Sequence, residues 1–152
     1  MMTIAIAIHT LCAVIWVGGM FFAYLALRPV AGSLLEPPLR LQLWRQVFSK
    51  FFPWVSMAVV LLLTTGLWMI FGVYGGMGNT RPYVHIMLLI GLIMMALYGH
   101  IYFAPYKRLQ KSVDEQNWQE GGVQLGKIRK LIAVNLSLGL LVVVVASAGR
   151  YF

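Results

Sequence analysis

The sequence predicts an all-α integral membrane protein that folds as a bundle of four transmembrane helices. Of its 152 residues, 61% are hydrophobic and 11% are charged, whereas soluble domains have about 45–50% apolar and about 25% charged residues. The mean hydropathy is +0.82. The apolar residues also gather into four long stretches that polar segments separate. Together these observations exclude an ordinary soluble domain.

Each apolar stretch is long enough, as a helix, to cross the roughly 30 Å hydrocarbon core of a bilayer. Proline and glycine set the expected boundaries, because proline cannot continue a helix and glycine tolerates turns. The first stretch ends before Pro29, Gly75 and Gly76 mark a turn, and the third lies between Pro82 and Pro105. The four predicted spans form a single domain over residues 1–152 and cover residues 4–27, 51–73, 83–103 and 131–148.

The segment between the first two spans has an amphipathic pattern that begins after Pro37 and Pro38. Its apolar residues recur at helical spacing, with polar residues on the opposite face. The apolar face holds Leu43, Trp44, Val47, Phe48 and Phe51, and the polar face holds Gln42, Arg45, Gln46 and Ser49. This pattern predicts a short interfacial helix that lies at the cytoplasmic headgroups.

The basic residues are distributed unevenly between the two sides of the predicted bundle. Ten of the 12 follow span 1 or flank the connection between spans 3 and 4, and only Arg81 and Arg150 lie on the other side. Because cytoplasmic loops are enriched in Lys and Arg, both termini are expected outside a bacterial cytoplasmic (inner) membrane. The net charge of +8 then reflects membrane topology and contact with anionic lipid headgroups. A nucleic-acid partner is not needed to explain it.

The first apolar stretch contains no acidic or basic side chain except that of His9. Such a residue is costly to place in lipid, so it is a hypothesis for a functional site. Trp16 and Met20 lie on the same helical stripe. The second ring nitrogen of His9 needs a polar neighbour, for which we expect a backbone carbonyl. The alternative to a ligand role is that His9 has only a structural role, with its ring hydrogen-bonded to a backbone carbonyl.

His85 begins the third span at a depth similar to that of His9, whereas His100 lies near the other end without a histidine at its level. Two histidines at one depth can hold a cofactor between helices. Imidazole suits copper, zinc or haem iron. Arg81 and Arg150 lie on the side of the pair and could meet two haem propionates, or could be interfacial anchors.

Three segments resemble the membrane domain of the CopD (copper resistance protein D) family, which is related to the HemJ protoporphyrinogen oxidases. They read IHTLCAVIWVGGMFF, RQVFSKFFPWVSMAVVLLLTTGLWM and YVHIMLLIGLIMMALYGHIYFAPYKRL. The resemblance implies a haem- or copper-binding four-helix bundle with His9 and His85 as ligand candidates. HemJ-like proteins have His-x-Lys at the start of the third helix, and here the sequence is His85-Ile86-Met87. The missing lysine counts against protoporphyrinogen oxidation.

Three classes of function follow from these observations. The first is a haem b redox or electron-transfer protein, an oxidoreductase if it is an enzyme, with His9 and His85 as ligands and an unidentified redox partner or quinone. Weaker ligand or lining candidates are Met87, His100 and Trp16. The second class is a copper-handling protein, and the third is a cofactor-free membrane subunit. Whether the chain forms a homodimer stays open.

The topology predicts that a cysteine introduced at position 117, in the connection between spans 3 and 4, reacts with a thiol reagent only from the cytoplasmic side. Reaction of intact cells with a membrane-impermeant maleimide measures this. Labelling at position 117 from the periplasmic side would overturn the predicted orientation.

Overall fold

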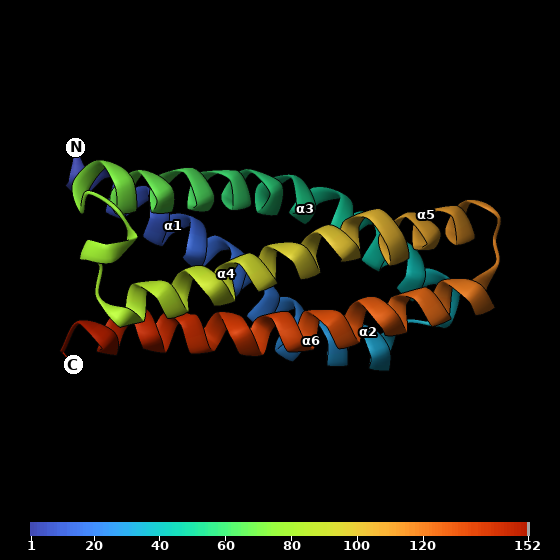
Figure 1. Cartoon of the computed structure of the whole chain (residues 1–152). Helices are drawn as coiled ribbons and strands as arrows, with labels where there is room; N and C mark the ends of the chain where they lie inside the picture. Colours follow the sequence, from blue (N-terminus) through green and yellow to red (C-terminus); the bar gives the residue numbers. More distant parts are fainter. Residues whose placement is uncertain (152) are drawn as a thin grey trace.

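The computed structural model describes residues 1–151, and every side chain in that range except that of Arg150. Within that range the chain is helical and has no strand. Four helical rods are long and apolar enough to cross a membrane: Met2–Leu34, Pro37–Val73, Pro82–Asp114 and Trp118–Ala148. They pack into one elongated bundle with both termini at the same end (Figure 1). The predicted fold class, an all-α four-helix membrane protein, is confirmed.

Three of the rods contain a π-helical segment. The first consists of α1 (Met2–Phe21), η1 (Phe22–Leu27) and α2 (Arg28–Leu34), and the second of α3 (Pro37–Trp68) and η2 (Met69–Val73). A 3₁₀ turn, η3 (Met77–Asn79), leads to the third rod, which consists of α4 (Pro82–Ile101), η4 (Tyr102–Tyr106) and α5 (Lys107–Asp114). The fourth is α6 (Trp118–Ala148), followed by η5 (Gly149–Tyr151).

Two rods continue through prolines at which the sequence predicts an end. Pro29 is the second residue after the π-helical η1, and Pro105 lies inside the π-helical η4. Proline lacks an N–H group and its ring clashes with the carbonyl one turn back. A wider π turn accommodates both defects, as is common in membrane helices. The rods therefore extend beyond the predicted spans at the end opposite the termini.

The predicted interfacial helix forms, but it is continuous with the second span instead of separate from it. Leu41, Trp44 and Phe48 are buried, because the neighbouring connection between spans 3 and 4 is also helical. There, α5 and the first turns of α6 pack together and against α3, and a tight turn at Gln116 with a φ of 55° joins them. The apolar face thus covers protein and not headgroups.

The helices pair as α1 with α3 and as α4 with α6, while α1 and α3 also contact α6. Tyr98 of α4 links the two pairs. Its hydroxyl donates to the Phe52 carbonyl at 3.0 Å and lies 2.7 Å from the Ser56 hydroxyl. Its ring meets that of Phe52 edge-on at 5.6 Å and that of Trp16 at 6.1 Å. The centre of the bundle is therefore an aromatic cluster with an internal hydrogen bond.

Asn135 and Gly139 are four residues apart in the sequence, a spacing that predicts a shared helix face toward another helix. In α6 both residues face other helices. The Asn135 side-chain amide donates to the Met94 carbonyl of α4 at 3.4 Å. At Gly139, a Cβ atom would lie 2.9 Å from a methyl group of Val17 and 3.1 Å from the terminal carbon of Met94. Since real Cβ atoms essentially never approach another atom to 2.9 Å, a side chain at this position would displace Val17, and glycine favours the close approach of α1, α4 and α6.

Replacement Gly139→Ala should lower the free energy of unfolding by about 1–3 kcal/mol, because the added methyl group overpacks this contact. Gly91→Ala is the matched control, since a Cβ there has no neighbour within 4 Å. Unfolding by sodium dodecyl sulfate in mixed micelles measures both. Equal stability of the two variants would contradict the close packing.

Candidate metal site at His9

His9 lies on α1, half-buried, and its ring contacts α3. Its Nδ1 atom is 2.8 Å from the Thr65 hydroxyl oxygen, which is itself 2.5 Å from the Leu61 carbonyl. A carbonyl only accepts, and a hydroxyl has one proton. Thr65 therefore donates to Leu61 and accepts from the Nδ1–H of His9. This leaves Nε2 of the neutral ring with its lone pair, in the state that binds metal ions.

Gly66 gives the imidazole room beside Thr65. A Cβ atom at this position would lie 3.4 Å from Cε1 and 3.9 Å from Nδ1 of His9. The ring thus packs directly against the α3 backbone. The Thr-Gly pair of the second span and the histidine of the first are one structural unit, although more than 50 residues separate them in the chain.

The partner of His9 differs from the expected backbone carbonyl. It is a side-chain hydroxyl, which passes the interaction on to the Leu61 carbonyl within α3. From sequence alone, a threonine in a membrane helix is expected to bond to carbonyls of its own helix. The neighbouring Thr64 does so, because its hydroxyl bonds to the carbonyls of Val60 and Leu61. Only the packing of α1 on α3 distinguishes the two threonines.

Two sulfur-containing side chains lie within one helical turn of this unit and were missed as candidates. Cys12 follows His9 by three residues on α1, a spacing at which helical side chains are neighbours, and it is buried. Met69 follows Thr65 by four residues and begins η2, which contacts α1. The signal was available in the sequence as the His-x-x-Cys spacing of the first span.

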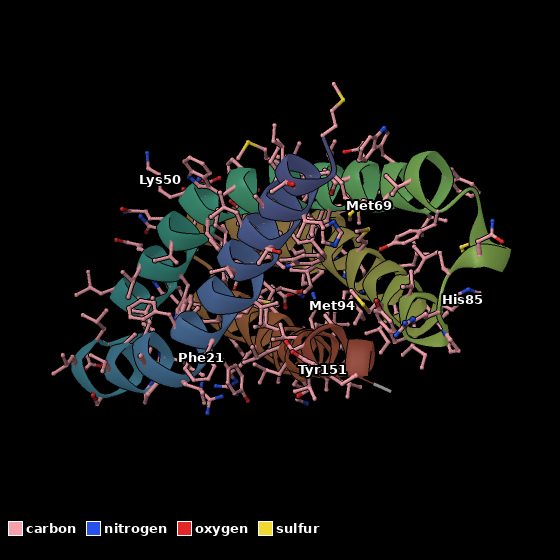
Figure 2. All side chains as sticks on the ribbon, turned by 90° about the vertical axis from the view of Figure 1, so that its left-hand side faces the viewer. Phe21, Lys50, Met69, His85, Met94 and Tyr151 are labelled. Atoms are coloured by element: carbon pink, nitrogen blue, oxygen red, sulfur yellow. The ribbon has the colours of Figure 1, made fainter. Side chains whose placement is uncertain are left out.

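His85 has a different environment at the start of α4. The side chain is exposed, and its Nε2 atom lies 3.0 Å from the Met77 carbonyl and 2.7 Å from the Thr80 hydroxyl oxygen. Thr80 donates its own proton to Met77 at 2.8 Å, so Nε2 carries hydrogen and donates. Figure 2 shows His85 beside this turn at the edge of the bundle, with Met69 and Met94 nearer its centre.

The two histidines therefore bond to different segments. His9 belongs to the α1–α3 pair, whereas His85 is on α4, which packs mainly against α6. The hypothesis that they share one cofactor stays a prediction. Among the described residues, no group of three or more His, Cys, Asp or Glu side chains is placed to hold a metal ion.

The other candidates occupy separate places. Trp16 is buried against Tyr98, in a packing role. His100 is exposed toward the opposite end of α4, and Met87 is half-buried. Arg81 is the N-cap residue of α4, at the same end of the bundle as His85. The side chain of Arg150 lies outside the described part of the chain.

Replacement Thr65→Val should shift the tautomer of His9, because the methyl group that replaces the hydroxyl cannot accept the Nδ1–H bond. The ¹⁵N chemical shifts of the His9 ring report this directly. Thr64→Val is a matched control that removes a hydroxyl without contact to His9. If both variants leave the ring shifts of the wild type unchanged, the assigned hydrogen bond is wrong.

Comparison with known proteins identifies the family. No curated protein and no solved structure gives a significant match to the chain. The family model of copper resistance protein D, in contrast, matches residues 45–148. The match covers α3 from Arg45, with Thr65 and Gly66, and all of α4, α5 and α6. Because it spans more than half of the sequence, this multi-pass membrane protein belongs to the copper resistance protein D family.

Proposed function

We propose that the protein handles copper within the membrane and that His9 is its principal copper ligand. The observation that carries the proposal is the Nδ1–H bond from His9 to Thr65, which presents an unprotonated Nε2 inside a membrane span. Membership of the copper resistance protein D family supports copper over other metals. Copper is here the substrate, as an ion that the protein binds in order to move or store it.

Cu(I) is the oxidation state that the neighbouring side chains suit. Cys12 and Met69 supply a thiol and a thioether, and such soft ligands favour Cu(I), while imidazole also binds copper well. On binding, the Cys12 thiol would release its proton to the solvent and coordinate as the thiolate. The thiolate, the neutral His9 and Cu(I) then carry no net charge, which lowers the cost of placing the ion in a low-dielectric region.

Access to this site is proposed from the end of the bundle that holds the termini. A shallow groove of about 470 Å³ runs along the seam of α1 and α3 and is lined in part by Met1, Ile8, Thr65 and Trp68. Its walls are mainly apolar, and Met1 is among the residues that line it. The uneven distribution of basic residues supports an opening on the periplasmic face of the inner membrane.

Haem b is the second candidate, because the same Nε2 atom could be an axial iron ligand. The fit is incomplete in the described structure. His85 would have to give up its bonds to Met77 and Thr80, and the rings of Trp16 and Tyr98 fill the space between α1 and α4 deeper in the bundle. The described residues therefore fit copper better than haem b.

His9→Ala should weaken Cu(I) binding by about tenfold or more, since even indirect ligand partners typically contribute 10–100-fold to metal affinity. His100→Ala, which alters an exposed histidine at the other end of α4, should bind like the wild type. Competition with a chromophoric Cu(I) chelator measures both in detergent solution.

Three results would decide against copper handling at His9. Equal Cu(I) affinity of the His9→Ala variant and the wild type would show that His9 is not a copper ligand. A Soret band in the purified wild type that is lost in both His9→Ala and His85→Ala would instead support the bis-histidine haem b protein. Protein with neither metal nor colour would favour the cofactor-free subunit.

A further inference from the structure

A second cavity lies at the opposite end of the bundle and is not connected with His9. It has a volume of about 360 Å³ and is bordered by η1, α2, the start of α3 and the first half of α6. This size is within the range of small-molecule sites. Three arginines line it, Arg28, Arg40 and Arg129, each from a different helix.

The positive charge of this pocket is not neutralised by the protein. None of the four acidic residues of the chain lines it. Arg28 lies over the ring of Tyr24 at 4.4 Å, and Arg40 donates to the Gly32 carbonyl only at 3.4 Å. In the described part of the chain, the ion pairs join Arg45 to Asp114 and Lys111 to Glu115. Most guanidinium donors of the pocket are therefore available to an anion.

The wall of the pocket is apolar toward the middle of the bundle and polar toward its end. Toward the middle of the bundle it is bordered by Ala23, Phe48 and Ile132, which belong to apolar stretches. Trp44 and Trp118 also line it, and tryptophan is typical of the boundary between lipid and water. Phosphate groups match the planar fork of arginine, and the apolar wall below suits a hydrocarbon chain.

Gly122 and Gly126 of α6 keep one wall of the pocket open. A Cβ atom at either position would have no neighbour within 4 Å. These glycines are thus not required for helix packing, in contrast to Gly139. They leave space beside Arg129 that a larger side chain would fill.

We propose that this pocket binds the phosphate headgroup of an anionic phospholipid, with Arg28, Arg40 and Arg129 around the phosphate and the acyl chains along the apolar wall. Basic pockets between transmembrane helices recognise anionic headgroups in this way. A free phosphate ion shares the headgroup chemistry, but it would leave the apolar wall without an occupant. A phospholipid in this site would contact η1 and α2 on one side and α6 on the other. It would therefore connect the end of the first rod to the fourth rod.

The test is thermal unfolding of delipidated protein in detergent during titration with phosphatidylglycerol. A ligand that binds only the folded state raises the melting temperature with a concentration dependence that is set by its dissociation constant. The same molar amounts of phosphatidylcholine or sodium phosphate should give little shift. Replacing the three arginines by glutamine should weaken the apparent affinity for phosphatidylglycerol by about tenfold or more.

Two further variants separate a site from general attraction. Arg108→Gln, Lys127→Gln and Lys130→Gln together remove the same charge from exposed positions outside the pocket, and this triple variant should keep the wild-type affinity. Gly126→Leu fills the pocket without replacing an arginine and should weaken binding while the protein stays folded.

The proposal fails if the control triple variant loses affinity as much as the arginine triple variant, because the attraction would then be nonspecific. It also fails if sodium phosphate alone reproduces the full shift, which would indicate a soluble anion. Should the arginine variant not fold, unchanged binding by Gly126→Leu is the result that overturns the site.

Discussion

Polar side chains inside a bilayer must find hydrogen-bond partners within the protein, because the hydrocarbon offers none. In this bundle three polar side chains of the spans bond across helix boundaries, whereas Thr64, Ser137 and Ser147 bond back to carbonyls of their own helix. Tyr98 bonds to the Phe52 carbonyl, Asn135 to the Met94 carbonyl, and His9 to Thr65. Each of these bonds joins two different rods. Since apolar faces alone pack equally well against lipid, these contacts and the close approach at Gly139 determine which helix faces which.

The same constraint gives His9 its chemical character. A neutral imidazole in a membrane span needs one partner, and Thr65 accepts from Nδ1 while its own proton goes to Leu61. The consequence is a ring with a fixed orientation and an unprotonated Nε2. A structural requirement of the bilayer thus also leaves Nε2 of His9 free to coordinate a metal ion, which links the packing of α1 on α3 to the copper handling proposed for this family member.

The two ends of the molecule differ in charge and in proposed role. The end with the termini carries the His9 unit and its apolar groove, with few charges. The other end carries most of the bases, the helical extensions α2 and α5, and the arginine pocket. In the proposed lipid site, three of the basic residues that predict the orientation of the chain would also bind a lipid headgroup in the folded protein.

The sequence by itself determined the membrane class, the number of spans, the uneven placement of the bases and the family, because segment length and composition decide whether a helix enters lipid. It also identified Gly139 and Asn135 as contact residues. It did not determine where the rods end, since Pro29 and Pro105 are accommodated by π turns whose formation depends on surrounding packing. The partner of His9, the different roles of Thr64 and Thr65, and the meeting of Arg28, Arg40 and Arg129 were decided only by the tertiary structure. Each depends on contact between residues far apart in the chain, and helical periodicity along one segment carries no information about the segment it faces.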